Sequence, residues 1–215
     1  MTRTASKRFP PFAPSTQTDP QDIRRRGTLG VFMRIGAYLL AALVASASPA
    51  SAQLSPSTVP FAIGIANFGK INDTYYRGAQ PKARDYSDLA RLGIRTVIDL
   101  TRDGESREPS AVAALGMRFF RIPMTTSDRP DAAAVDEFLS IVNNPANQPV
   151  YVHCQGGRHR TGLMTALYRL THDGWSADRA FDEMRQYEFE KGFVSHAVLK
   201  NFLYDFYRAA PHPTS

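Results

Sequence analysis

Apolar and polar positions follow two different periods along residues 74–208. Short apolar runs bounded by turn residues predict strands at 74–77, 96–100, 118–124 and 149–153. Apolar residues spaced by three and four predict helices at 85–92, 110–115, 131–143, 161–172, 177–187 and 196–208. Helices interleaved with short strands are typical of an α/β domain, in which helices flank a central, mostly parallel sheet.

The first fifty residues follow another pattern. Residues 1–32 lack apolar periodicity, so we expect them to be disordered or to precede the true start of translation at Met33. Residues 33–52 have the three parts of a signal peptide: Arg34, an apolar run over 35–47, and a cleavage motif ending at Ala52. A membrane anchor fits this pattern less well, because the apolar run is shorter than the roughly 18 residues of a spanning helix. A twin-arginine signal that uses residues 24–26 is a second alternative, and it also fits the pattern less well.

Cleavage after Ala52 would leave residues 53–215 as one domain in the periplasm or outside the cell, with no stable membrane association. The leader also explains the net charge of +6 and the pI near 9.6. Seven of the 26 basic residues and two of the 20 acidic residues lie within residues 1–52, so the rest of the chain is nearly neutral. The charge therefore does not indicate a nucleic-acid partner.

The single cysteine, Cys154, excludes an intramolecular disulfide and a metal site built from several cysteines. It follows a predicted buried strand, and Arg160 lies directly before the next predicted helix. Amides of a glycine-containing loop, a helix N-terminus and a guanidinium together bind phosphate, and they also favour a thiolate. The predicted phosphate-binding residues are Gln155, Gly156, Gly157, Arg158, His159 and Arg160.

Two neighbours are candidates for supporting roles in this loop. The Thr161 hydroxyl is placed to donate to the Cys154 sulfur, and the His153 imidazole is placed to brace the loop from behind. A helix-initial hydroxyl and a satisfied core histidine are the structural alternatives. Arg158 and His159 are expected to add positive charge beside the phosphate.

The segment His153-Cys154-x5-Arg160-Thr161-Gly162 resembles the signature loop of the cysteine-dependent protein tyrosine phosphatases, in their compact, atypical dual-specificity branch. Residues 76–81, Tyr-Arg-Gly-Ala-Gln-Pro, resemble the opening strand and turn of that branch, and residues 97–100 resemble its next strand. Exported bacterial members, the periplasmic tyrosine phosphatases, share a signal peptide. The resemblance implies a compact dual-specificity-phosphatase fold.

The resemblance also implies a mechanism that needs no metal and no other cofactor. Cys154 would carry a phosphocysteine, Arg160 and the loop amides would hold the phosphate, and an aspartic acid from an upstream loop would serve as general acid and base. Asp128 is the preferred acid, because Asp131 suits the N-cap of the following helix. Asp99, inside an apolar strand, suits a structural role.

The expected substrate is a phosphorylated protein, mainly at phosphotyrosine, with phosphoserine and phosphothreonine as further candidates. An inositol polyphosphate or pyrophosphate is the alternative, although relatives of that specificity tend to have a basic residue where this chain has Gln155. Two other classes of protein remain: a non-catalytic phosphate-binding module and a rhodanese-like sulfurtransferase. The retained Cys154 and Arg160 disfavour the first, and the Arg-Thr-Gly continuation with Asp128 disfavours the second.

Overall fold

The computed structural model describes residues 63–192 and 196–210, all of which belong to one unit, residues 60–215. The predicted N-terminal extension (1–32), the signal peptide (33–52) and its cleavage site lie outside the described residues. Within the described ranges, no helix combines the length and the apolar character that crossing a bilayer requires.

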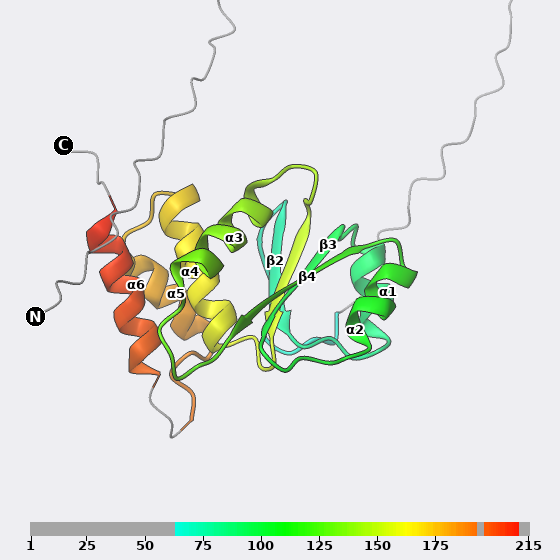
Figure 1. Ribbon diagram of the computed structural model, residues 1–215, viewed down its shortest axis with the longest axis horizontal. Helices are drawn as coiled ribbons and strands as arrows, with labels where there is room; N and C mark the ends of the chain where they lie inside the picture. Colours follow the sequence, from blue (N-terminus) through cyan, green and yellow to red (C-terminus); the bar gives the residue numbers. More distant parts are fainter. Residues whose placement is uncertain (1–62, 193–195, 211–215) are drawn as a thin grey trace, which may run out of the picture. The chain divides into compact units, whose positions relative to one another are not determined.

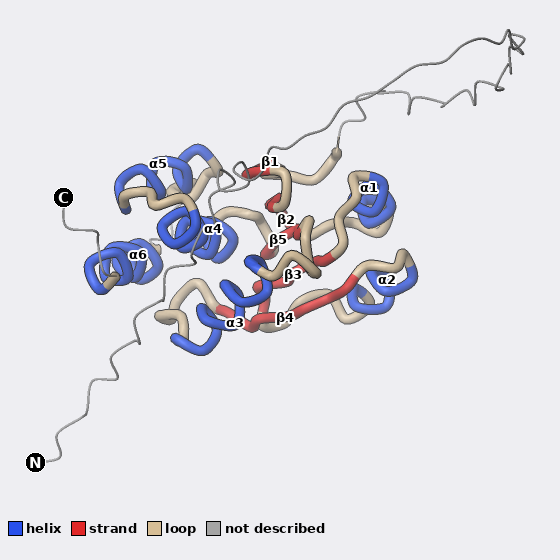
Figure 2. The backbone as a smooth tube through the Cα atoms, turned by 90° about the horizontal axis from the view of Figure 1, so that it is seen from above, coloured by secondary structure: helices blue, strands red, loops and turns tan. Residues whose placement is uncertain are grey.

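The described residues form a sheet of five strands, four of them parallel. The strands lie in the order β1 (Gly69–Asn72), β2 (Tyr75–Ala79), β5 (Val150–Cys154), β3 (Thr96–Thr101) and β4 (Arg118–Met124). Only the edge strand β1 runs antiparallel, and it pairs with β2 (Figure 2). The predicted α/β class with a mostly parallel sheet is confirmed.

Helices cover both faces of this sheet (Figure 1). One face carries α1 (Asp85–Arg91) and α2 (Glu108–Ala114). The other carries α3 (Ala132–Asn143), α4 (His159–His172), α5 (Ala177–Gln186) and α6 (Ala197–Ala209). The two-residue period of the strands separates two hydrophobic cores: Val97 and Tyr151 pack on the α1 and α2 side, whereas Ile98 and Val152 pack on the α3 to α6 side.

The predicted elements are all present, with small shifts at their ends. Strand β1 was not predicted, because Gly69–Asn72 is short, lies at the edge and contains one strongly apolar residue. Helix α4 begins at His159, two residues earlier than predicted, because its first turn carries polar residues rather than apolar ones. Asp131 caps α3, and its side chain accepts a hydrogen bond from the Ala133 N–H at 3.3 Å.

Candidate active site

The predicted phosphate loop connects β5 to α4. Cys154 is the last residue of β5 and is 2% exposed, and Arg160 lies in the first turn of α4. The sheet register pairs Cys154 with Ala79, so the end of β2 lies beside the start of the loop. Chain segments far apart in the sequence therefore meet around the cysteine.

Three consecutive loop carbonyls are held from outside the loop. The Gln155 carbonyl accepts from the Gln80 N–H at 3.2 Å, the Gly156 carbonyl from Asn67 Nδ2 at 2.8 Å, and the Gly157 carbonyl from Arg77 Nη2. In a trans peptide the N–H points away from the carbonyl, so the N–H groups of residues 156, 157 and 158 face the opposite side. These amides form a cradle for an anion around Cys154.

Gly157 is required by this arrangement. Its φ is +66°, and a Cβ at this position would lie 2.5 Å from the carbonyl carbon of Gly78 and 2.7 Å from the amide nitrogen of Ala79. A side chain would therefore be strained in its backbone conformation and would also collide with the end of β2. The glycine allows the loop to lie directly against that strand.

The surroundings of Cys154 favour its thiolate. Burial alone would raise the pKa of Cys154, but the Thr161 hydroxyl and amide, the Arg160 guanidinium and the Gly157 N–H together hold it below its ordinary value. The Thr161 hydroxyl is itself fully buried and has no other hydrogen-bond partner among the described residues, so it is available to the sulfur. This agrees with the role predicted for Thr161.

The lowered pKa gives a direct prediction. Because the thiolate is the form that iodoacetamide alkylates, the rate should rise with pH and level off above the pKa of Cys154. We expect the pH midpoint of alkylation to be lower in the folded protein than in the same chain unfolded in urea. In the unfolded chain the midpoint should lie at the ordinary cysteine pKa of about 8.5. With one cysteine in the chain, mass spectrometry reads this single site. A folded-state midpoint equal to or above the unfolded one would contradict the assignment.

Arg160 lies between the phosphate loop and the segment that follows β4. Its Nη1 donates to the Met124 carbonyl at 3.2 Å, and its Nε is buried without a partner. A cleft of about 230 Å³ opens beside it. The cleft is lined by Arg102, Asp103, Met124, Thr125, Thr126, Ser127 and Arg160.

The loop predicted to supply the general acid forms one wall of this cleft. Asp128 is exposed, and its Oδ2 accepts from the Thr125 hydroxyl at 2.7 Å. Its backbone N–H donates to the same hydroxyl oxygen at 3.0 Å, so a tight turn holds the carboxylate. Arg129 fastens the loop to α6 through Asp205, with Nη1 2.6 Å from Oδ2. The structure thus brings the loop to Arg160, while the Asp128 carboxylate is engaged with Thr125.

The positive charge expected from Arg158 and His159 is smaller than the sequence suggests. Arg158 Nε lies 2.9 Å from Glu188 Oε2, so this guanidinium is already paired. Burial, followed by the neighbouring His196 and the two loop arginines, lowers the pKa of His159 to about 4. His159 is therefore neutral at pH 7, and its ring lies against His196 with centroids 3.5 Å apart. The expected positive charge was therefore wrong for His159. The local sequence could not show this, because Glu188 and His196 lie about 30 or more residues further along the chain.

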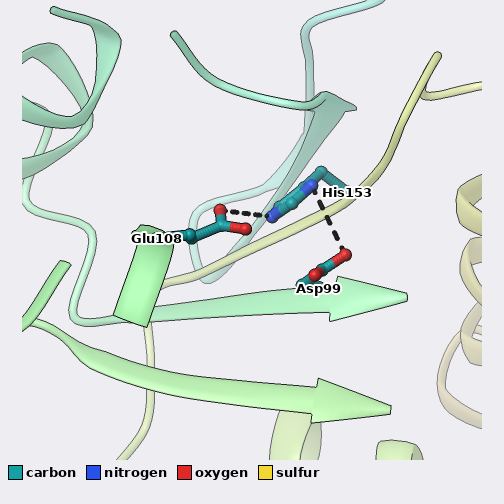
Figure 3. A group of neighbouring side chains, drawn as sticks. All are labelled: Asp99, Glu108 and His153. Carbon is teal, nitrogen blue, oxygen red and sulfur yellow. Dashed lines mark ion pairs between the residues drawn. The ribbon is translucent and has the colours of Figure 1, made fainter. Parts of the chain in front are cut away.

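Behind the loop, His153 is fully buried between two carboxylates (Figure 3). Its Nε2 lies 2.9 Å from Glu108 Oε1, and its Nδ1 lies 4.0 Å from Asp99 Oδ1. Burial opposes ionisation of Glu108, but the contact with His153 and the hydroxyl of Tyr86 hold its pKa below the ordinary value. The two carboxylates thus hold His153 within the domain, and its predicted role in bracing the loop stays a prediction. Glu108 is a partner that the sequence did not indicate.

Asp99, Glu108 and His153 are residue types that also bind metals, and their polar atoms lie within 4.8 Å of one another. However, the two carboxylates face opposite nitrogens of one ring, so they do not converge on a point that this imidazole also reaches (Figure 3). Both Asp99 oxygens also accept hydrogen bonds, from Thr101 and from Arg121 Nε at 2.8 Å. The cluster orients an imidazole, and Asp99 has the structural role expected of it.

Several residues around the site were missed or misread in the sequence. Asn67 and Glu188 were missed because they belong to no periodic pattern of apolar residues. In the structure both have a positive φ, 52° for Asn67 and 63° for Glu188. Tyr187 was also missed, and the centroid of its ring lies 3.9 Å from Cζ of Arg77. Arg77 was noted only as part of a strand motif.

Comparisons with known proteins agree with this geometry. Residues 64–200 match a family model described as PTP-NADK, a DSP-PTPase phosphatase fused to NAD+ kinase. The dual specificity protein phosphatase TpbA of Pseudomonas aeruginosa is 32% identical over 158 residues, which cover 73% of this chain and 67% of TpbA. The inositol diphosphatase SIW14 of Saccharomyces cerevisiae is 30% identical over 131 residues, which cover 58% of this chain and 46% of SIW14.

Solved structures of the same two proteins share the fold. The core catalytic domain of yeast SIW14 superposes with a TM-score of 0.59 at 26% identity, over 68% of this chain and 88% of that domain. The crystal structure of TpbA superposes with a TM-score of 0.54 at 30% identity, over 64% of this chain and 83% of the crystallised chain. Residues 64–200, which match the family model, include the strand, loop and helix that surround Cys154.

Proposed function

The chain belongs to the DSP-PTPase phosphatases, and on that basis we propose that it hydrolyses phosphomonoesters, phosphotyrosine first among them, through a phosphocysteine on Cys154. The observation that carries the proposal is the position of the only cysteine, inside a loop whose amides face inward and whose helix supplies Arg160. Membership in a phosphatase family removes the support for a sulfurtransferase or a non-catalytic phosphate-binding module.

In the first step, the Cys154 thiolate attacks phosphorus, so that an S–P bond forms as the bond to the leaving oxygen breaks. The loop amides and the Arg160 guanidinium hold the remaining phosphate oxygens and stabilise the charge that they carry. Asp128, protonated, gives its proton to the leaving oxygen. To do so, its carboxyl group exchanges the Thr125 hydroxyl for the substrate.

In the second step, a water molecule attacks the phosphocysteine. The Asp128 carboxylate accepts a proton from that water, an O–P bond forms, and the S–P bond breaks. Inorganic phosphate leaves, and Cys154 returns to the thiolate form that its surroundings favour. Aspartate and cysteine thus both recover their initial protonation states.

Replacing Asp128 with asparagine should lower kcat on phosphotyrosine by about 10²-fold or more, the scale of general acid catalysis. The loss should be smaller for an aryl phosphate whose leaving group needs no proton. Asp131→Asn is the matched control, because asparagine caps a helix as well as aspartate does and α3 should therefore keep its first turn. Initial rates on both substrates measure the effect. An Asp128→Asn variant with wild-type kcat, or an equal loss in Asp131→Asn, would exclude Asp128 as the acid.

An inositol pyrophosphate is the second candidate substrate, since one observation favours it. The cleft beside Arg160 is lined by the hydroxyl residues Thr125, Thr126 and Ser127 and by Arg102, with Met124 as its apolar contribution. Such walls suit a polyhydroxylated ring, and SIW14 is named for activity on inositol substrates. Against it, Gln155 is uncharged, Arg158 is paired with Glu188, and His159 is neutral at pH 7.

A substrate panel separates these candidates. Phosphotyrosine, phosphoserine and phosphothreonine peptides and an inositol pyrophosphate should be compared by kcat/KM, with Cys154→Ser as the blank. The proposal predicts the largest value for phosphotyrosine. A larger value for the pyrophosphate would identify the second candidate as the substrate class, and no hydrolysis above the blank would refute the proposed function.

We further propose that the enzyme is exported and that its mature form begins at Gln53. Support comes from the sequence of residues 33–52, in which a basic residue, an apolar run and a small-residue cleavage motif follow one another. Expression of the full chain in a bacterium, followed by fractionation and N-terminal sequencing, tests this. Unprocessed protein in the cytoplasm would contradict it.

A further inference from the structure

Arg77 is a buried cation without a carboxylate partner among the described residues. Its side chain is fully enclosed at 0% exposure, and Nε and Nη1 have no hydrogen-bond partner. Burying an unpaired charge is strongly unfavourable, so such a residue in a native fold calls for a physical reason. Its contacts lie at the phosphate loop and at the turn after α5.

Two contacts hold the guanidinium in place. Nη2 donates to the Gly157 carbonyl. The guanidinium also stacks on the Tyr187 ring, with Cζ 3.9 Å from the centroid of that ring. Because the Gly157 carbonyl faces Arg77, the N–H of residue 158 in the same peptide unit faces the phosphate cradle. Arg77 thus fixes the last of the three inward-facing amides from the outer side of the loop.

The charged and titratable groups facing Arg77 come from three parts of the fold. Burial lowers the pKa of Arg77, while Tyr75 on its own strand, Tyr187, Glu183 on α5 and Cys154 oppose that effect. Glu183 is already paired with Arg169, with its Oε1 2.7 Å from Arg169 Nη2. The anion left to balance Arg77 is therefore the one formed at Cys154.

We propose that Arg77 is a positioning residue of the phosphoryl-transfer site, which fixes the Gly157–Arg158 peptide and supplies a positive charge balanced by the Cys154 thiolate and the bound phosphate. The inference deepens the proposed function and rests on it, since a phosphate must occupy the cradle during turnover. No contact with the substrate is required of Arg77 itself, because its guanidinium lies behind the loop.

Two measurements that do not depend on turnover test this role. The first is the pH profile of Cys154 alkylation by iodoacetamide, and the second is the affinity for tungstate, an oxyanion of phosphate shape, by calorimetry. In Arg77→Met, the alkylation midpoint should rise by about one pH unit, a roughly tenfold slower reaction below the midpoint. Tungstate affinity should fall by about tenfold or more, the scale of one lost charged hydrogen bond.

Arg77→Lys keeps the charge but loses the planar fork, so the midpoint should move less and tungstate affinity should still fall. The matched control is Arg118→Met, because Arg118 lies at the start of β4 and donates to the Ala146 carbonyl at 3.1 Å, away from the loop. This control should leave both measurements unchanged. Far-UV circular dichroism establishes that each variant is folded.

A folded Arg77→Met with a wild-type midpoint and wild-type tungstate affinity would overturn the inference. If that variant does not fold, Arg77→Lys decides: wild-type affinity would overturn the inference, and reduced affinity would support it. A different result would refute the proposed function: the wild-type protein would hydrolyse no phosphomonoester, even though its cysteine is alkylated with the expected pH profile. The two ideas therefore have distinguishable failures.

Discussion

Replacing Cys154 with serine should reduce phosphomonoester hydrolysis by at least about 10⁴-fold, the scale at which removal of a catalytic nucleophile acts. The interactions that lower the pKa of the thiol cannot bring a serine hydroxyl, which is far less acidic, to its anion near pH 7. The loop amides and Arg160 remain, so tungstate should still bind. Initial rates on an aryl phosphate and calorimetry measure the two effects.

Serine differs from cysteine by one atom and is slightly smaller, so the buried position of Cys154 accommodates it and the fold should be retained. Circular dichroism and the preserved tungstate affinity serve as controls for that expectation. Turnover within about tenfold of wild type would mean that another group attacks phosphorus, and such a result cannot be reconciled with a nucleophilic Cys154.

Arg160→Lys should lower kcat/KM by about 10³-fold, near the lower end of what transition-state arginines contribute to phosphoryl transfer. The guanidinium presents several donors in a fixed plane to the phosphate oxygens, whereas lysine offers one flexible charge. Arg160 Nη1 is tied to the Met124 carbonyl and its Nε is buried, so the group is held at the cleft with donors to spare. Steady-state rates on an aryl phosphate provide the measurement.

Arg158→Met is the control for this prediction, because Arg158 lies two residues earlier in the same segment. Its guanidinium is paired with Glu188, so its loss should change kcat/KM by less than about tenfold, as expected for a partly exposed ion pair. If Arg158→Met were as damaging as Arg160→Lys, the net charge of the loop, rather than the geometry of Arg160, would carry the effect.

Local patterns were sufficient to predict most of the fold. The short apolar runs of β3 and β5 and the three-to-four spacing in α3 and α6 are properties of a few consecutive residues, and these elements formed where expected. Capping of α3 by Asp131 is likewise a local effect, confirmed at the N-cap. The nucleophile and the phosphate-binding arginine lie within one short segment, so their spacing pointed to the site without knowledge of the fold.

The rest of the site depends on contacts between segments far apart in the chain. Asn67 reaches Gly156 across 89 residues, and Arg77 reaches Gly157 across 80 residues. The ion pair of Arg158 depends on Glu188, and the lowered pKa of His159 follows its burial beside His196. Such effects arise only once distant segments of the chain meet in the fold, as β2 and β5 do in the sheet, so composition and periodicity could not indicate them.

The central claim is that phosphorus passes through the sulfur of Cys154. The most direct measurement is quenching of the Asp128→Asn variant in alkaline denaturant, in which an S–P bond persists, during turnover of an aryl phosphate, followed by mass spectrometry of the peptide that contains Cys154. Since this variant should hydrolyse the intermediate slowly, the account predicts one phosphoryl group on Cys154 and none in Cys154→Ser. Steady product formation while Cys154 remains unmodified at every quench time would contradict it.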